Sequence, residues 1–247
     1  MSDDRSNFSL APVPAGRNPH ALATGIGGCP ADRTAADAIA RWAQRVSRDL
    51  RSAQSESMRA LLAAVDAKDP YTRAHSAVVA AYAQAIGRRM ELPASTLEGL
   101  GTAALLHDVG KIGVPDHILT KPGPLTSEEF EAVKRHPTIA DDILGHMSFL
   151  DEVRPLILFH HEWYDGGGYP AGLVGEEIPL GARILAVADA IDTMSSPRAY
   201  KRPYGRDQIR RELVAGAGRQ FDSAIVDVSL RWLDETRPTG CGLLPKS

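Results

Sequence analysis

The sequence has little cysteine, no long apolar run and no large excess of either charge. Its two cysteines, Cys29 and Cys241, lie near the two ends, so no disulfide framework is predicted. The longest apolar runs, such as Ile184 to Ala188, are far too short to span a bilayer, and the acidic N-terminus lacks the features of a signal peptide. A net charge of −3 and a pI near 6.2 argue against a nucleic-acid-binding face. We expect a cytoplasmic globular protein that binds neither DNA, RNA nor a membrane.

The sequence also lacks the alternation of apolar and polar residues that is typical of β-strands. Apolar residues recur with helical spacing instead, and this predicts an all-α fold. Proline and glycine gather near the N-terminus, where they favour a tail without regular structure. We therefore expect a flexible tail at 1–32, a helical segment at 33–68, one helical domain at 69–235 and a C-terminal tail at 236–247.

Caps, glycines and prolines predict where helices begin and end. The segment Thr126–Glu129 fits a capping box at the start of a helix. Gly110 is expected to end a helix, and the segments 111–124 and 165–170 are expected to be loops because they are rich in proline and glycine. The expected helices cover residues 35–66, 70–90, 94–109, 127–136, 138–146, 150–161, 180–194, 206–215 and 223–235.

An imperfect apolar stripe follows the helical period through residues 35–66. It includes Trp42, Val46, Leu50 and Val65. A stripe of this kind has two explanations, which both stay open at this point. The helix pairs with a second copy of the chain, or it packs on its own domain.

The stretch Ala103–Gly113 is unusual because charged and polar groups end an apolar, helix-like run. His107 and Asp108 follow the run directly, and Lys111 comes three residues later. Charged groups rarely occupy core positions without partners, because removing them from water costs several kcal/mol. The His-Asp pair therefore predicts a partner, and we interpret that partner as a metal centre.

Other histidines and aspartates of the chain could complete such a centre. Five imidazoles and two carboxylates, without a thiolate, suit a metal such as iron, manganese or zinc. Each histidine taken alone is more often a hydrogen-bonded structural residue. The spacings are not those of a zinc finger or a zincin, so the ligands would have to converge from separate helices. The candidate residues are His75, His107, Asp108, His136, His160, His161 and Asp189.

Short motifs connect these residues in a fixed order along the chain. They are Tyr71–Ser76, Leu106–Asp116, Lys121–Gly123, Leu125-Thr126, His136-Pro137, His160–Glu162, Asp165-Gly166, Gly168–Pro170 and Ala186–Asp189, followed by Asp192, Ser196, Arg198 and Tyr200. With these motifs, the chain from Asp69 to about Ile225 resembles the HD-GYP family of bacterial cyclic dinucleotide phosphodiesterases. The resemblance implies an HD-domain helical bundle, preceded here by an N-terminal helical extension.

The resemblance also implies two divalent metal ions. One would be bound by His75, His107, Asp108 and Asp189. The second would share Asp108 and add His136, His160 and His161. Tyr71 stands where some family members have a glutamate for a third metal, so we expect two. Iron and manganese are the expected metals, with zinc, nickel, magnesium and cobalt as further candidates.

The same motifs suggest which residues would act on the substrate. Asp108 and Lys111 would serve catalysis, with Lys111 contacting a phosphate, whereas its alternative role is to neutralise a helix C-terminus. Tyr169 would lie in a loop that faces the substrate. Arg198 and Lys201 would contact guanine or phosphate, unless they are ordinary solvated charges. Asp69 would lie beside the site, although a role as helix N-cap explains it equally well.

The implied activity is metal-dependent hydrolysis of cyclic di-GMP to pGpG, with GMP as a possible further product, in bacterial second-messenger signalling. Two alternatives remain. The substrate could be another cyclic dinucleotide of the cGAMP type, or the chain could be a non-catalytic module that binds a nucleotide or partner proteins. Signalling proteins and a second copy of the chain are the expected protein partners.

Overall fold

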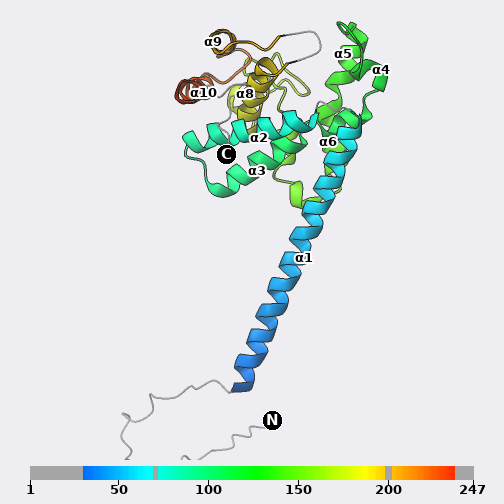
Figure 1. Ribbon diagram of the computed structural model, residues 1–247, viewed down its shortest axis with the longest axis vertical. Helices are drawn as coiled ribbons and strands as arrows, with labels where there is room; N and C mark the ends of the chain where they lie inside the picture. The colour runs from blue at the N-terminus through cyan, green and yellow to red at the C-terminus, as the bar shows by residue number, and fades with distance from the viewer. Residues whose placement is uncertain (1–29, 69–71, 198–201, 237–247) are drawn as a thin grey trace, which may run out of the picture. The chain divides into compact units, whose positions relative to one another are not determined.

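The computed structural model describes residues 30–68, 72–197 and 202–236 (Figure 1). Within these ranges the chain forms helices and no β-strand, which confirms the all-α prediction. None of the described helices combines the length and the apolar character needed to cross a bilayer. Of the residues discussed above, seven lie outside the described residues: Cys29, Asp69, Tyr71, Arg198, Tyr200, Lys201 and Cys241.

The α-helices are interrupted by three short 3-10 helices, labelled η. In chain order they are α1 (Pro30–Lys68), α2 (Thr72–Arg89), α3 (Ala94–Leu106), η1 (Val109–Gly113), α4 (Asp116–Leu119), α5 (Ser127–Lys134), α6 (His136–Leu144), η2 (Ser148–Leu150), α7 (Arg154–Leu158), η3 (Gly175–Glu177), α8 (Leu180–Ser195), α9 (Arg206–Gly216) and α10 (Ser223–Glu235).

The chain divides by its internal contacts into two units, Met1–Ala53 and Gln54–Ser247. In the described part of the first unit, α1 exposes the apolar side chains of Ile39, Trp42, Val46 and Leu50. The last turns of α1 belong to the second unit. There, Val65 is buried in the core, and Met58, Leu61 and Leu62 pack against it. The domain boundaries stated above stay a prediction.

The core of the second unit lies between α2, α3, α8 and α10. Ile86 of α2, Leu100 of α3 and Leu185 of α8 are completely buried. Tyr82 of α2 packs against Trp232 of α10, with 5.0 Å between the ring centroids. Helices α2 and α3 lie side by side (Figure 1) and are joined by a short connection. This packing holds the C-terminal end of α3, which His107 directly follows, close to the N-terminal half of α2, which contains His75.

Several predicted helix boundaries are wrong. The helix expected at 94–109 ends at Leu106, and the chain continues as η1 through Gly110. The expected loop at 111–124 contains the one-turn helix α4. The helix expected at 138–146 begins earlier, at His136, and the helix expected at 150–161 is reduced to α7 with η2 before it. The capping box is confirmed. The Thr126 hydroxyl accepts a hydrogen bond from the backbone N–H of Glu129, and the Glu129 carboxylate accepts a hydrogen bond from the backbone N–H of Thr126.

The reason for the error at Gly110 is a close backbone approach. A Cβ atom at this position would overlap the carbonyl oxygen of His136 and crowd the backbone nitrogen of Ala140. Glycine is therefore needed so that η1 can lie directly against the start of α6. The glycine that predicted a helix end instead brings Asp108 and His136 into one neighbourhood.

Candidate metal centre

All seven residues proposed as metal ligands meet in the described structure. One group, whose potential ligand atoms lie within 4.8 Å of one another, consists of His75, His107 and Asp108. A second group with the same spacing consists of His136, His160 and His161. Asp189 of α8 joins the first group, because its Oδ1 lies 3.2 Å from Nε2 of His75. The residues come from separate helices, as the spacing in the sequence required.

Three of the histidines are oriented in the same way by the turn that precedes them. Nδ1 of His107 lies 2.7 Å from the carbonyl oxygen of Ala104, three residues earlier. The same contact joins His136 to Val133 at 2.9 Å and His160 to Ile157 at 2.6 Å. A carbonyl oxygen can only accept, so Nδ1 carries the proton in each ring and Nε2 keeps its lone pair. This tautomer is the one that can bind a metal through Nε2.

His75 is oriented by a carboxylate instead of a carbonyl. Its Nδ1 donates to Oδ2 of Asp192 over 2.6 Å, and both side chains are buried. The other oxygen of Asp192 accepts a hydrogen bond from the Ser196 hydroxyl at 3.0 Å. A carboxylate on the second nitrogen of a histidine is a frequent companion of metal ligation, because it fixes the ring and increases its basicity.

Asp108 lies between the two groups. Its Oδ2 is 3.4 Å from Nε2 of His107 and accepts a hydrogen bond from Nζ of Lys111 at 2.7 Å. Its Oδ1 faces the other group, 3.7 Å from Nε2 of His136. The carboxylate therefore has one oxygen toward each group, which is the arrangement that a shared ligand requires.

The electrostatics of the two groups differ. Burial opposes the charge of His75, but Asp189 and Asp192 outweigh it and raise the pKa of His75 to about 9. In the second group, burial lowers the pKa of His136, and burial together with His161 lowers the pKa of His160 well below its ordinary value. Burial and His136 lower the pKa of His161 to about 3. These three rings are therefore neutral at pH 7 and keep their lone pairs.

The acidic residues remain ionised in spite of their burial. Burial opposes ionisation of Asp108, yet Lys111 and His107 hold the pKa of its carboxyl well below the usual range. Burial likewise opposes the charge of Asp189, but the hydrogen bond with His75 and the neighbouring imidazole of His107 lower its pKa. Both carboxylates are thus available as anionic ligands.

The donor set fits a divalent metal. Among the residues that the structure describes, Nε2 of His136 and Nε2 of His160 are buried without a hydrogen-bond partner. An unpaired buried polar atom is costly unless something absent from the protein chain satisfies it. Two such atoms in one cluster, next to an ionised carboxylate, match imidazole and carboxylate ligation of iron, manganese or zinc.

A cleft of about 260 Å³ opens over these groups. Lys111 and Tyr169, both proposed as substrate contacts, line it together with His75, Asp189 and Thr193. The Tyr169 ring packs on His161 with 4.9 Å between the centroids, and burial raises the pKa of its hydroxyl. The phenol is therefore a neutral hydrogen-bonding group at the edge of the cleft.

Glu162 holds the loop that contains Tyr169. Its buried carboxylate accepts hydrogen bonds from the backbone N–H groups of Ala171 and Gly172, at 2.6 Å and 3.1 Å. The loop also comes very close to the segment after His161. A Cβ atom at Gly168 would overlap the backbone of Glu162 and Trp163, so glycine is needed there for close approach rather than for a positive φ.

Two of these residues, Asp192 and Glu162, received no role from the sequence. A signal for Asp192 exists, because it lies three residues after Asp189 on α8 and shares its face. Glu162 directly follows the His-His pair. Their roles depend on contacts with residues far away in the sequence, and no local pattern encodes these contacts. The proposed substrate residues Asp69, Arg198 and Lys201 lie outside the described residues.

Comparisons with known proteins agree with this geometry. The family model described as "HD domain" matches residues 35–225. A cyclic di-GMP phosphodiesterase of Vibrio cholerae is 38% identical over 197 residues, which cover 74% of this chain and 40% of the relative. A 3'3'-cGAMP-specific phosphodiesterase 2 of the same organism is 37% identical over 189 residues, covering 76% of this chain and 36% of the relative. This chain therefore spans less than half the length of these relatives.

The fold also resembles a solved structure, that of Bd1817, described as an HDG"Y"P protein from Bdellovibrio bacteriovorus. The TM-score is 0.54 at 18% identity, and the alignment covers 66% of this chain and 52% of the other. The helical fold and the family-model match define an HD-domain protein. Within that class the chain belongs to the HD-GYP family, as its motifs indicated.

Proposed function

We propose that this chain is a metal-dependent phosphodiesterase that hydrolyses cyclic di-GMP to pGpG, with GMP as a possible further product. The observation that carries the proposal is the convergence of two candidate metal-binding groups on a cleft that also contains Lys111 and Tyr169. The cyclic di-GMP phosphodiesterase of Vibrio cholerae supports this substrate. Because that relative is much longer than this chain, the activity must be tested on the chain itself.

Each residue of the cleft has a role in this proposal. Bound divalent metals would activate water and stabilise the negative charge that develops on the phosphate. Asp108, with one oxygen toward each group, would be the shared ligand. Lys111 would exchange part of its contact with Asp108 for a phosphate oxygen of the substrate. Tyr169 would contact the nucleotide, and Asp69, Arg198 and Lys201 are proposed as further substrate contacts on sequence grounds alone.

The proposed cofactor is a pair of divalent metal ions, most favourably iron or manganese. The ligand set supports this choice because it combines imidazole and carboxylate donors without a thiolate. Zinc, nickel, magnesium and cobalt are further candidates, and metal supply would decide among them. The count of two rests on the two groups and on Tyr71 in place of a glutamate.

The direct test is hydrolysis of cyclic di-GMP by purified protein supplied with iron or manganese under reducing conditions. Metal content is measured on the same sample, and pGpG and GMP are separated by chromatography. We expect turnover that depends on metal and is lost in Asp108→Ala. The absence of turnover in fully metal-loaded protein would contradict the proposal and favour a binding module.

A cGAMP-type substrate is the second candidate, and the 3'3'-cGAMP-specific relative from Vibrio cholerae supports it. Competition between equal concentrations of cyclic di-GMP and 3'3'-cGAMP separates the two candidates, since the better substrate is consumed first. A purely binding role is less favoured because all seven candidate ligands and Lys111 are present. A cytoplasmic location and signalling proteins as partners stay predictions.

A homodimer formed through α1 is also proposed. The support is the apolar stripe of Ile39, Trp42, Val46 and Leu50, which is exposed in the described structure and follows helical spacing. An aspartate on this stripe would place an unpaired charge in the apolar interface of such a dimer. We therefore expect Leu50→Asp to change the sedimentation coefficient from dimer to monomer, and an unchanged coefficient would contradict the proposal.

A further inference from the structure

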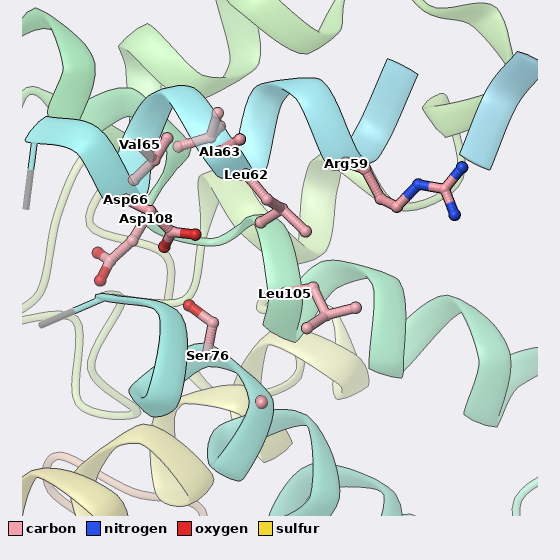
Figure 2. Close-up of a pocket in the computed structure, with 10 residues that line it drawn as sticks. Arg59, Leu62, Ala63, Val65, Asp66, Ser76, Leu105 and Asp108 are labelled. Atoms are coloured by element: carbon pink, nitrogen blue, oxygen red, sulfur yellow. The ribbon is translucent and has the colours of Figure 1, made fainter. Parts of the chain in front are cut away.

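A second cavity, of about 330 Å³, has Asp108 in its lining, as the cleft does (Figure 2). The end of α1, the start of α2 and the end of α3 enclose it, and all of its lining residues belong to the unit Gln54–Ser247. Its walls are mostly apolar. The lining residues are Arg59, Leu62, Ala63, Val65, Asp66, Ser76, Ala77, Leu105, Asp108 and Val109.

A buried hydroxyl group points into this cavity without a partner. Ser76 is only 2% exposed, and its Oγ has no hydrogen-bond partner among the described residues. Figure 2 shows its side chain rising from α2 toward α1, across the space that the cavity occupies. A buried polar group is normally satisfied, so this hydroxyl has a hydrogen bond to offer to a molecule that enters the cavity.

The polar groups of the cavity are separated along its length. Asp66, Asp108 and Ser76 lie toward one end, Leu62 and Leu105 face each other in the middle, and Arg59 lies toward the other end (Figure 2). The Arg59 side chain is exposed and forms no ion pair with any described residue. The acidic end favours a group that donates hydrogen bonds, whereas the basic end favours an anion.

We propose that this cavity binds a purine nucleoside monophosphate, with the base inside and the phosphate at Arg59. An N–H group on the edge of a purine such as guanine would donate a hydrogen bond to the Ser76 hydroxyl. Its flat faces would pack between Leu62 and Leu105. A volume of about 330 Å³ is within the range of small-molecule sites. A fatty acid also has an apolar body and an anionic group, but it has no donor for the inner end.

The cavity is connected to the candidate metal centre through Asp108 and Val109. Asp108 lines both the cavity and the cleft. A nucleotide in the cavity would therefore contact the segment that carries the shared carboxylate and would alter metal-dependent turnover without occupying the cleft. GMP is chosen as the probe because it is a product in the proposed function, so this choice rests on that function. The proposal that the cavity is a binding site does not rest on it.

The test is calorimetric titration of the full, metal-loaded chain with GMP, with guanosine and inorganic phosphate as separate probes. Ala63→Trp places an indole in the cavity, and we expect it to weaken GMP binding at least about tenfold, because the filled space excludes the base. Arg59→Ala and Ser76→Ala each remove one polar contact, with an expected loss of about three- to tenfold. Guanosine is expected to bind more weakly than GMP in the wild type but equally in Arg59→Ala.

Two matched controls come from exposed positions. Ala60→Trp adds an indole to α1, and Arg88→Ala removes a charge from α2, in both cases outside the cavity lining. Both should bind GMP like the wild type. Equal affinities of Ala63→Trp and Ala60→Trp for GMP would overturn the proposal.

The candidate metal centre is the competing location for GMP. One set of results would place the nucleotide in the cleft. Inorganic phosphate would bind with the same affinity as GMP, Lys111→Ala would abolish the binding of both, and the cavity variants would abolish neither. The cavity proposal would then be wrong. Should Ala63→Trp fail to fold, the comparison of Arg59→Ala with Arg88→Ala decides in the same way. If the wild-type protein does not hydrolyse cyclic di-GMP, the proposed function is wrong. The binding comparisons would still test the cavity.

Discussion

The hydrogen bond between His75 and Asp192 makes a quantitative prediction about metal binding. Both side chains are buried, and the 2.6 Å distance from Nδ1 to Oδ2 is that of a strong, charge-assisted contact. Asp192→Asn preserves the size of the side chain and its contact with Ser196 but removes the charge. Loss of such a partner typically lowers metal affinity about 10- to 100-fold, or about 1.4–2.8 kcal/mol.

The expected loss is confined to one of the two groups. Asp192 contacts His75, whereas the group of His136, His160 and His161 is oriented by backbone carbonyl groups or by packing. Competition with a fluorescent chelator gives the affinities, and elemental analysis gives the number of metals bound. We expect one metal to be weakened in Asp192→Asn and the other to be retained.

A matched control separates this effect from a general loss of structure. Asp142 is an exposed aspartate on α6, and Asp142→Asn should bind both metals like the wild type. Wild-type affinity for both metals in Asp192→Asn would refute the assignment of Asp192 as a positioning residue. A parallel loss of both metals with a lower melting temperature would also refute it, because the effect would then be structural.

Other predictions follow from the same geometry. Asp108→Ala removes the carboxylate that faces both groups, so it should not retain two metals in elemental analysis; a protein with both metals bound would exclude a shared ligand. Lys111→Met should keep its metals and lose about 100-fold in kcat, and a change in KM alone would contradict a role in charge stabilisation. The metal-free His75 carries a proton below its pKa of about 9, so metal affinity at its group should rise by up to about tenfold per pH unit from pH 7 to 9. At the group of His136, whose pKa is lowered by burial, affinity should stay nearly flat over that range in the same chelator assay. Glu162→Gln weakens the anchor of the Tyr169 loop and should raise KM with unchanged metal content, while an unchanged KM would show that the loop does not bind substrate.

The fold class and the candidate ligands could be predicted from the sequence for different reasons. Helical periodicity and the absence of strand patterns are local signals, and they predicted the all-α fold and most helices. The ligand set came from motifs in a fixed order, because spacing alone cannot show that His75 and Asp189 meet. Their convergence became visible only in the packing of α2 against α8.

The errors share one physical origin, which is contact between distant segments. Gly110 resembled a helix end, but its function is to let η1 touch the start of α6. Asp192 and Glu162 had no assigned role because their partners, His75 and the backbone at Ala171, lie elsewhere in the chain. The cavity beside Ser76 could not be expected at all, because three separate helices enclose it.

The carbonyl contacts of His107, His136 and His160 have a consequence for design. In each case the acceptor lies three residues earlier, so one turn of backbone contains both the candidate metal ligand and the group that orients it. A histidine of this kind and the carbonyl group that orients it belong to one short segment of the chain. Grafting only a helix end with its histidine onto another scaffold would transfer a correctly oriented nitrogen, whereas grafting His75 would also require a second helix to supply Asp192.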